Sequence, residues 1–301
     1  MPPVNAPRPS PSRIRSVEAI HRSTGFHWVG DGFFVSTYFP SPGLPSERVS
    51  PFVLMDYGPP RAFEPLAHGK RGVGWHPHRG FETVTLAWEG TVRHRDNAGH
   101  GGLIGPGDAQ WMTAAAGIFH EEYHGEDLTR QGGTLHMMQL WVNLPRKDKF
   151  APPGYQSLEA GSFPKVALAG GGTARVIAGE FQGARGPART FTPITMLDVQ
   201  LPPGGVLPVQ LPATFNALAV VAKGRVTAAG RDAGAGELML FGNDGERLEL
   251  VAAEAAHVIL LAGEPIDEPI VQHGPFVMNS AEEIRQAIFD VNSGRFGPIP
   301  V

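Results

Sequence analysis

Short apolar stretches separated by glycine and proline run through most of the chain and predict many β-strands. Residues 26–39 (FHWVGDGFFVSTYF) place apolar and aromatic side chains on both sides of a Gly-Asp-Gly turn, which is typical of a β-hairpin. Residues 51–56 and residues 83–86 read as further strands, and a turn at Gly90 follows the second of them. The 39 glycines and 29 prolines are therefore read as turn residues between the strands of an all-β protein.

The strand pattern of the first half returns in the second half. Residues 217–228 repeat the order of strand, glycine turn and strand found in residues 82–94, and residues 235–240 repeat the turn and strand that begin at residue 106. Two copies of one unit predict tandem β-barrels. We expect a loose, proline-rich tail at residues 1–16, a first barrel at 17–145, a linker at 146–161 and a second barrel at 162–270. The C-terminal residues 271–301 are expected to carry a docking helix.

One α-helix is predicted close to the C-terminus. Ser280 and Glu283 have the spacing of a capping box, and Gly294 is well placed to end the helix. An apolar stripe at helical spacing is formed by Ile284, Ala287, Ile288 and Val291. We expect this whole stripe to be buried across the barrels.

Two pairs of metal-ligand residues flank the same small β unit. His76 and His78 are two residues apart, as are His120 and Glu122. Side chains at i and i+2 of a strand share a face, roughly 7 Å apart at the backbone, so two imidazoles can converge on one ion with bonds of about 2 Å. A lone His-x-His is a weak signal, because histidine also serves polar and packing roles. If the two strands adjoin, the pattern predicts one site of three nitrogens and one carboxylate oxygen.

Glu82 is a further candidate for this site. It shares the parity of His76 and His78 if the strand runs unbroken, whereas a bulge at Gly80 would break that parity. Pro77 removes a backbone donor, which places the segment at a sheet edge or a barrel mouth, where an open metal site belongs.

The segments HPHRGFETVT, QWMTAAAGIFHEE, QLWVNLP and EPIVQHGPFVMNSAEEIRQAI resemble the pirins, a branch of the cupin superfamily. The resemblance extends from about residue 51 to residue 290 and is weaker in the first fifty residues. It implies a bicupin fold, with two tandem antiparallel β-barrels of the jelly-roll type and a C-terminal helix. It also implies metal ligation by His76, His78, His120 and Glu122. Many cupins use instead the glutamate at the place of Glu82, which we keep as a residue that contacts the ligands.

Other histidines and aromatic residues have less specific interpretations. His124 is expected beside the ligands or at the surface. Loop or packing roles are expected for His94, His100 and His136, and barrel-core positions for Trp88, Trp111 and Trp141. Phe119 and Met112 are read as core residues, with the floor of a substrate pocket as the alternative. Between residues 160 and 263 the only histidine is His257, so the second barrel is predicted to lack the metal site.

Composition excludes several classes of protein. The chain has 301 residues, no cysteine and a net charge of −4, so disulfides, thiolate zinc sites and cysteine nucleophiles are excluded. A basic stripe of the kind that binds nucleic acid is missing. Apolar runs of membrane-spanning length and an N-terminal leader are also missing. We expect a cytoplasmic protein that binds neither nucleic acid nor membrane.

The resemblance implies an oxidoreductase that cleaves the ring of a flavonol, similar to quercetin 2,3-dioxygenase (quercetinase). Its substrates would be the flavonol and O2, with Glu122 or Glu82 as the base for the substrate hydroxyl. Fe(II) is the expected ion, with Mn, Ni, Cu or Zn as alternatives, since an imidazole-rich site suits all of them. A metal-dependent regulator that docks on a transcription factor or a metabolic enzyme is the alternative. A cupin isomerase or a storage-type protein is a third interpretation.

Overall fold

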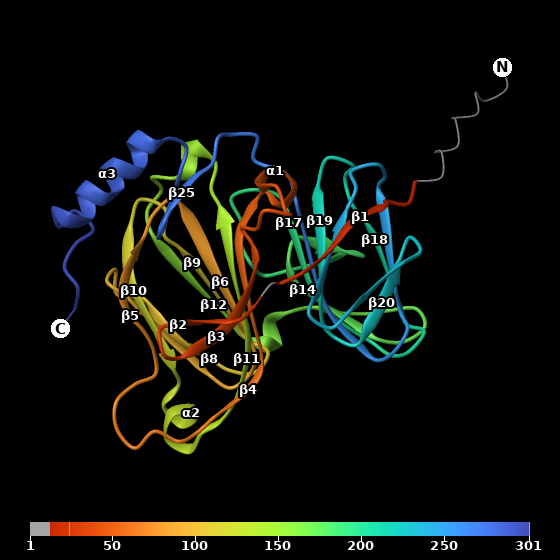
Figure 1. Ribbon diagram of the computed structural model, residues 1–301, viewed down its shortest axis with the longest axis horizontal. Coiled ribbons are helices and arrows are strands. Elements are labelled where there is room, and N and C mark those ends of the chain that lie inside the picture. The colour runs from red at the N-terminus through yellow and green to blue at the C-terminus, as the bar shows by residue number, and fades with distance from the viewer. Residues whose placement is uncertain (1–12, 24, 301) are drawn as a thin grey trace.

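The computed structural model describes residues 13–23 and 25–300 and consists of two β-barrels side by side (Figure 1). In the first barrel, a seven-stranded sheet of order β12-β9-β6-β11-β4-β3-β2 faces a four-stranded sheet of order β5-β10-β7-β8. Its strands are β2 (His27–Val29), β3 (Phe33–Phe39), β4 (Phe52–Phe63), β5 (Gly72–His78), β6 (Phe81–Glu89), β7 (Val92–Asp96), β8 (Gly101–Ile104), β9 (Ala109–Thr113), β10 (Ile118–His124), β11 (Gly133–Asn143) and β12 (Gly154–Leu158).

The second barrel repeats this arrangement, with sheets of order β1-β22-β19-β24-β17-β14-β13 and β18-β23-β20-β21. Its strands are β1 (Val17–Arg22), β13 (Lys165–Ala167), β14 (Thr173–Ala178), β17 (Ile194–Leu201), β18 (Val206–Gln210), β19 (Asn216–Lys223), β20 (Arg225–Ala228), β21 (Arg231–Gly234), β22 (Glu237–Phe241), β23 (Arg247–Ala252) and β24 (Ala256–Gly263). Two short hairpins are added, β15 (Glu180–Phe181) with β16 (Ala184–Arg185) and β25 (Val271–His273) with β26 (Phe276–Met278).

Helices are few in the described residues. They are α1 (Ser46–Val49), α2 (Glu126–Gln131), α3 (Ala281–Asn292) and the 3-10 turns η1 (Arg146–Asp148) and η2 (Ala160–Ser162). No helix among residues 13–23 and 25–300 is long and apolar enough to cross a membrane. The predicted architecture of two tandem antiparallel barrels with a C-terminal helix is confirmed.

The two seven-stranded sheets pack against each other and form the interface between the barrels. Val84 and Leu86 of β6 lie in one apolar cluster with Leu218 of β19 and Leu261 of β24. Since side chains alternate along a strand, the intervening Thr85 points the other way, into the first barrel. Buried residues of β6 therefore alternate between the barrel interface and the interior of the first barrel.

The predicted domain bounds need two corrections close to the N-terminus. Strand β1 pairs with β22, so residues 17–22 complete the sheet of the second barrel and not the first. Arg15, expected in a loose tail, is 1% exposed and donates hydrogen bonds to the carbonyls of Phe215 and Pro212 at 2.6 and 2.5 Å. Residues 1–12 of the predicted tail lie outside the described residues.

The predicted linker at residues 146–161 contains β12, which pairs with β9 and extends the large sheet of the first barrel. The sequence GYQSL has little apolar alternation, and only its pairing partner makes it a strand. Leu158 is nevertheless buried in the interface between the barrels. The remaining predicted bounds stay predictions.

A buried polar network crosses the interface between the barrels. Asp198 of β17 accepts hydrogen bonds from His257 at 2.6 Å, from Arg175, and from Trp88 of the first barrel at 3.1 Å. Burial alone would raise the pKa of Asp198, but the bond and charge of His257 and the Arg175 guanidinium outweigh it and lower that pKa to about 2. His257 thus belongs to the interface, as does Trp88.

His136 lies at the edge of this network, where its Nε2 is 3.0 Å from the hydroxyl of Tyr57. Burial, together with the charge of His257, lowers the pKa of His136 to about 4. Trp111 also belongs to the apolar interface, whereas Trp141 stacks on Phe81 inside the first barrel with ring centroids 4.2 Å apart.

Helix α3 begins and ends where the sequence predicts. The Ser280 side chain accepts from the backbone N–H of Glu283 at 3.2 Å, and Gly294 has a φ of +73° just beyond the last turn. Ile284 and Ala287 are buried in a cluster with Phe276 and Phe296, and Val291 is partly buried against it.

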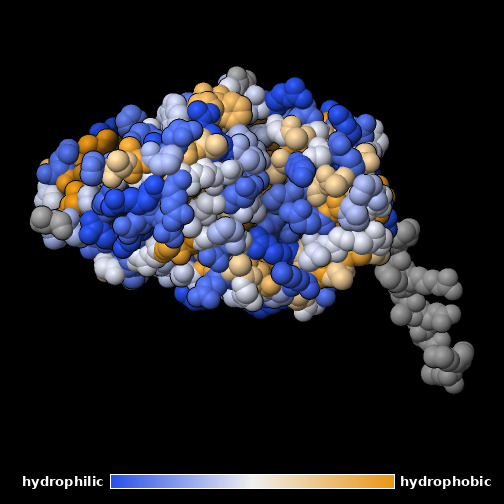
Figure 2. All heavy atoms as spheres, turned by 90° about the horizontal axis from the view of Figure 1, so that it is seen from below, coloured by the Kyte–Doolittle hydropathy of each residue, from blue (hydrophilic) through white to orange (hydrophobic). Residues whose placement is uncertain are grey.

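The prediction that Ile288 is buried is wrong, because this side chain is 37% exposed. The helix rests on a narrow stripe of buried residues. Asp290, one turn beyond Gln286, is also buried, and it pairs with Arg79. Ile288, Phe289 and Ile299 are among the exposed large apolar side chains. Figure 2 shows that apolar patches are scattered over a largely polar surface on the face seen there.

We predict that Ile284→Asp lowers the free energy of unfolding by about 3 kcal/mol, because it buries an unpaired charge. Ile288→Asp on the same helix is the matched control and should leave stability near that of the parent. Urea unfolding measures both. Equal stability of the two variants would show that α3 does not rest on the Ile284 stripe.

A second prediction concerns the loss of stability at acidic pH. As the pH falls, His136 takes up a proton near pH 6.5 in the unfolded chain but only near pH 4 in the folded protein. The unfolded state therefore binds more protons between these values, and stability falls across this window. His136→Gln should show a smaller loss of stability between pH 7 and pH 5 than the parent in urea unfolding. Parallel losses in the two proteins would contradict the assignment.

Candidate metal centre

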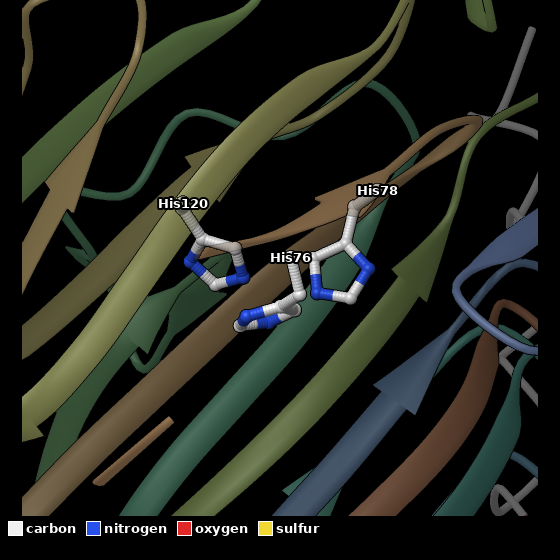
Figure 3. A group of neighbouring side chains, drawn as sticks. All are labelled: His76, His78 and His120. Atoms are coloured by element: carbon white, nitrogen blue, oxygen red, sulfur yellow. The ribbon is translucent and has the colours of Figure 1, made fainter. Parts of the chain in front are cut away.

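Strands β5 and β10 bring His120 together with His76 and His78. They are antiparallel neighbours, and the register places His76 directly opposite His120. His78 follows two residues later on the same face of β5. The ring centroids of the three imidazoles lie 4.2 to 4.8 Å apart, and the side chains point toward one another (Figure 3). One ligand nitrogen from each residue lies within 4.8 Å of the others, so the three can hold one ion.

Backbone carbonyls orient two of these rings. Nδ1 of His76 is 2.8 Å from the carbonyl oxygen of Gly74, and Nδ1 of His78 is 3.3 Å from that of Pro275. A carbonyl only accepts, so in both rings Nδ1 carries the hydrogen and the lone pair remains on Nε2. Metal-binding histidines in proteins are commonly held in this way through their second nitrogen.

His120 is the most enclosed of the three. It is 0% exposed, its Nδ1 lies 3.3 Å from Nδ1 of His94, and its Nε2 has no hydrogen-bond partner among the described residues. A buried polar atom without a partner is costly, and a metal ion would satisfy it. Burial, and then the neighbouring His76, holds the pKa of both His78 and His120 well below the usual value. Neutral imidazole is the form that binds a metal.

Glu122 is held at the other side of His120. Its Oε1 accepts from Nε2 of Gln110 at 2.7 Å and from the Thr85 hydroxyl at 3.4 Å, and its Oε2 accepts from Nε2 of Gln139 at 2.9 Å. One carboxylate oxygen lies within 4.8 Å of ligand nitrogens of both His94 and His120. The carboxylate is therefore oriented from three strands before any ligand is present.

Glu82 is not part of this cluster. Gly80, with a φ of +90°, separates β5 from β6, and Glu82 lies on the face of β6 that carries Val84 and Leu86 to the barrel interface. Its Oε1 accepts from the Thr113 hydroxyl at 2.7 Å. Burial raises its pKa to about 7. The parity expected for an unbroken strand fails because the turn at Gly80 resets the alternation.

His94 is the residue of the site that the sequence reasoning missed. It lies on β7, which pairs with β10, is 1% exposed and stacks on Tyr155 with ring centroids 4.9 Å apart. The alternation of residues 92–96 (VRHRD) was the available signal, because the two arginines mark the outer face and leave the histidine inside. Gln110 and Gln139 carried no comparable signal.

The remaining candidates have packing or surface roles. His124 lies two residues beyond Glu122. Its Nε2 is 2.7 Å from the carbonyl oxygen of Gly32, and its ring packs on Phe63. Met112 is buried in a small cluster with Ile118. Phe119 packs against the C-terminal cluster, and His100 pairs with Asp96 at 3.1 Å. None of the four contacts the three imidazoles through a hydrogen bond among the described residues.

Comparison with known proteins identifies the family of the chain. The pirin family model matches residues 35–142, and the model of the pirin C-terminal cupin domain matches residues 196–297. A Pseudomonas aeruginosa protein that carries the provisional name quercetin 2,3-dioxygenase is 48% identical over 284 residues, which cover 94% of this chain and 99% of that protein. Human pirin is 38% identical over 259 residues, which cover 83% of this chain and 84% of that protein.

Solved structures show the same likeness. The crystal structure of a quercetin 2,3-dioxygenase from Acinetobacter baumannii matches with a TM-score of 0.91 and 42% sequence identity, covering 96% of this chain and all of that one (100%). A bacterial pirin from Escherichia coli in complex with nickel(II) shares the fold with a TM-score of 0.62 at 20% identity. The chain belongs to the pirin family of the cupin superfamily.

Proposed function

We propose that this protein is a metal-dependent dioxygenase that cleaves the ring of a flavonol, as the name quercetin 2,3-dioxygenase describes for its relatives. The observation that carries the proposal is the convergence of three imidazoles, whose ligand nitrogens lie within 4.8 Å of one another, with the oriented carboxylate of Glu122 beside His120. The substrates are then a flavonol and O2.

The proposed ligands are His76, His78, His120 and Glu122, and the proposed ion is Fe(II). Three imidazoles and a carboxylate also suit Mn, Ni, Cu and Zn, so the donor set fits a divalent transition metal in general. When bound, the ion supplies a Lewis-acidic centre with open positions for an oxygen-bearing substrate and O2. The partnerless Nε2 of His120 supports an ion at this point.

Glu122 is the proposed base for the flavonol hydroxyl, and Glu82 is left out because it faces the barrel interface. The amides of Gln110 and Gln139 donate to opposite oxygens of Glu122 and fix the plane of the carboxylate. Oε2 accepts a single hydrogen bond among the described residues and is the oxygen proposed to take the proton. The stacked pair of Phe81 and Trp141 beside His78 keeps water from this side of the site.

The metal content is predicted to be one ion per chain, with none in the second barrel. His78→Ala should lose most of the bound metal, because it removes one of four ligands. His273→Ala, which removes an exposed histidine, is the control and should keep it. Elemental analysis of protein purified without chelators measures the content. Two equivalents per chain, or full occupancy in His78→Ala, would contradict the proposed ligand set.

Glu122→Gln is predicted to lower turnover by about 100-fold or more, because the amide keeps the size of the side chain but cannot take the proton. Glu82→Gln is the matched control and should turn over at a rate near the parental one, since its carboxyl lies on the other side of the sheet. Single-turnover oxidation of a flavonol, with metal occupancy measured on the same samples, compares the three proteins.

Negligible flavonol oxidation by the metal-loaded parent and by both variants would count against the proposed dioxygenase activity. A defect of Glu122→Gln in binding a protein partner would then favour the metal-dependent regulator. Equal loss of activity in Glu82→Gln and Glu122→Gln would show that the assignment of the base is wrong.

A further inference from the structure

The segment from Pro275 to Phe296, here called the C-terminal segment, lies across the end of the first barrel (Figure 1), where its Pro275 carbonyl contacts His78. We propose that this segment is a working part of the metal centre, because its docking positions His78 as a ligand. The proposal rests on the metal site proposed above. It assigns positioning roles to Arg79, Asp290 and Phe296, none of which is a proposed ligand.

The first contact is to the ligand itself. The carbonyl oxygen of Pro275 lies 3.3 Å from Nδ1 of His78, although the two residues are 197 positions apart in the chain. This acceptor is what places the hydrogen on Nδ1 and the lone pair on Nε2. His76 donates the corresponding bond to the Gly74 carbonyl in its own strand, so of these two rings it is His78 that depends on a distant segment.

The backbone next to His78 is joined to the same segment. Arg79 donates its N–H to the Pro275 carbonyl at 3.4 Å and accepts from the N–H of Val277 at 3.1 Å. At Gly80 the two chains are so close that a Cβ atom would lie 2.0 Å from the carbonyl oxygen of Val277. The turn after His78 is therefore built to receive this segment, and only glycine fits there.

Lys149 stabilises this contact through hydrogen bonds to both chains. Its ammonium group is buried, at 1% exposure, and donates to the carbonyls of Gly80 and Val277 at 2.7 and 2.8 Å and to Oδ1 of Asn143 at 2.7 Å. One side chain thus links the ligand-bearing turn, the end of β11 and the C-terminal segment. Three well-formed bonds are what a buried ammonium requires.

The Arg79 side chain extends the link to α3. Its Nη1 donates to Oδ2 of Asp290 at 2.8 Å, its Nε donates to the Ala116 carbonyl at 2.7 Å, and its guanidinium lies 4.5 Å from the centre of the Phe296 ring. The side chains of the ion pair are only 7% and 11% exposed. A buried pair of this kind is strongly disturbed when one partner loses its charge.

Residues of α3 that never touch the ion should therefore control how tightly it binds. Loosening the Arg79–Asp290 pair lets the turn at residues 79–80 shift, and the Pro275 carbonyl no longer fixes the ring of His78. Partners that orient a ligand in this way typically change metal affinity by 10–100-fold. A segment that merely covers the barrel would change stability without changing affinity.

The test is the affinity of the full chain for Ni(II), measured by competition with a chelator for Asp290→Asn and for the parent. We expect Asp290→Asn to bind Ni(II) about 10-fold or more weakly. Glu282→Gln is the matched control, because it removes an exposed carboxylate of the same helix, one that pairs with the exposed Arg285. It should bind like the parent. Phe296→Leu keeps an apolar side chain in the cluster and should weaken binding in the same direction.

A second readout separates positioning from stability. In metal-free protein with ¹⁵N-labelled histidine, the parent should show His78 protonated at Nδ1, and Asp290→Asn should show a mixture of tautomers. Folded Asp290→Asn and Phe296→Leu with parental affinity and an unchanged His78 signal would overturn the inference. If the parent itself binds no Ni(II) at these histidines, the proposed metal site fails as well, so the two failures are distinguishable.

Discussion

The pairing of β5 with β10, with His76 opposite His120, is the contact on which the site depends. It brings together two short motifs that are more than forty residues apart. In each motif, the side chains at alternate positions then point into the first barrel. The orientation of the His76 and His78 rings is then fixed by two backbone acceptors, the carbonyls of Gly74 and Pro275. A one-residue slip of β10 would turn His120 and Glu122 outward.

The first barrel therefore carries both a packed interior and an open chemical site, and the second barrel supports it. The face of the large sheet that does not line the site is buried against the second barrel, with Leu86 packed among Leu218 and Leu261. Asp198 and His257 add a polar contact to Trp88 across the same interface. His257 thus serves the contact between the barrels, where the buried carboxylate of Asp198 is its partner.

Features set by local periodicity were predictable from the sequence. The parity of residues two apart identified the candidate ligands on β5 and β10, and capping chemistry identified both ends of α3. Features that depend on distant pairing were not predictable in this way. The turn at Gly80 reversed the face of Glu82, and β1 crossed to the sheet of the second barrel. Ile288 is exposed because α3 buries a narrower stripe than the spacing of its apolar residues predicts.

The central claim is that His76, His78, His120 and Glu122 surround one point in the first barrel. Anomalous diffraction at the metal absorption edge, from crystals of metal-loaded protein, tests it most directly. The account predicts a single peak in each chain, about 2 Å from Nε2 of each of the three histidines and at a similar distance from an oxygen of Glu122. A peak bound by other residues, or one that leaves His120 without contact, would contradict it.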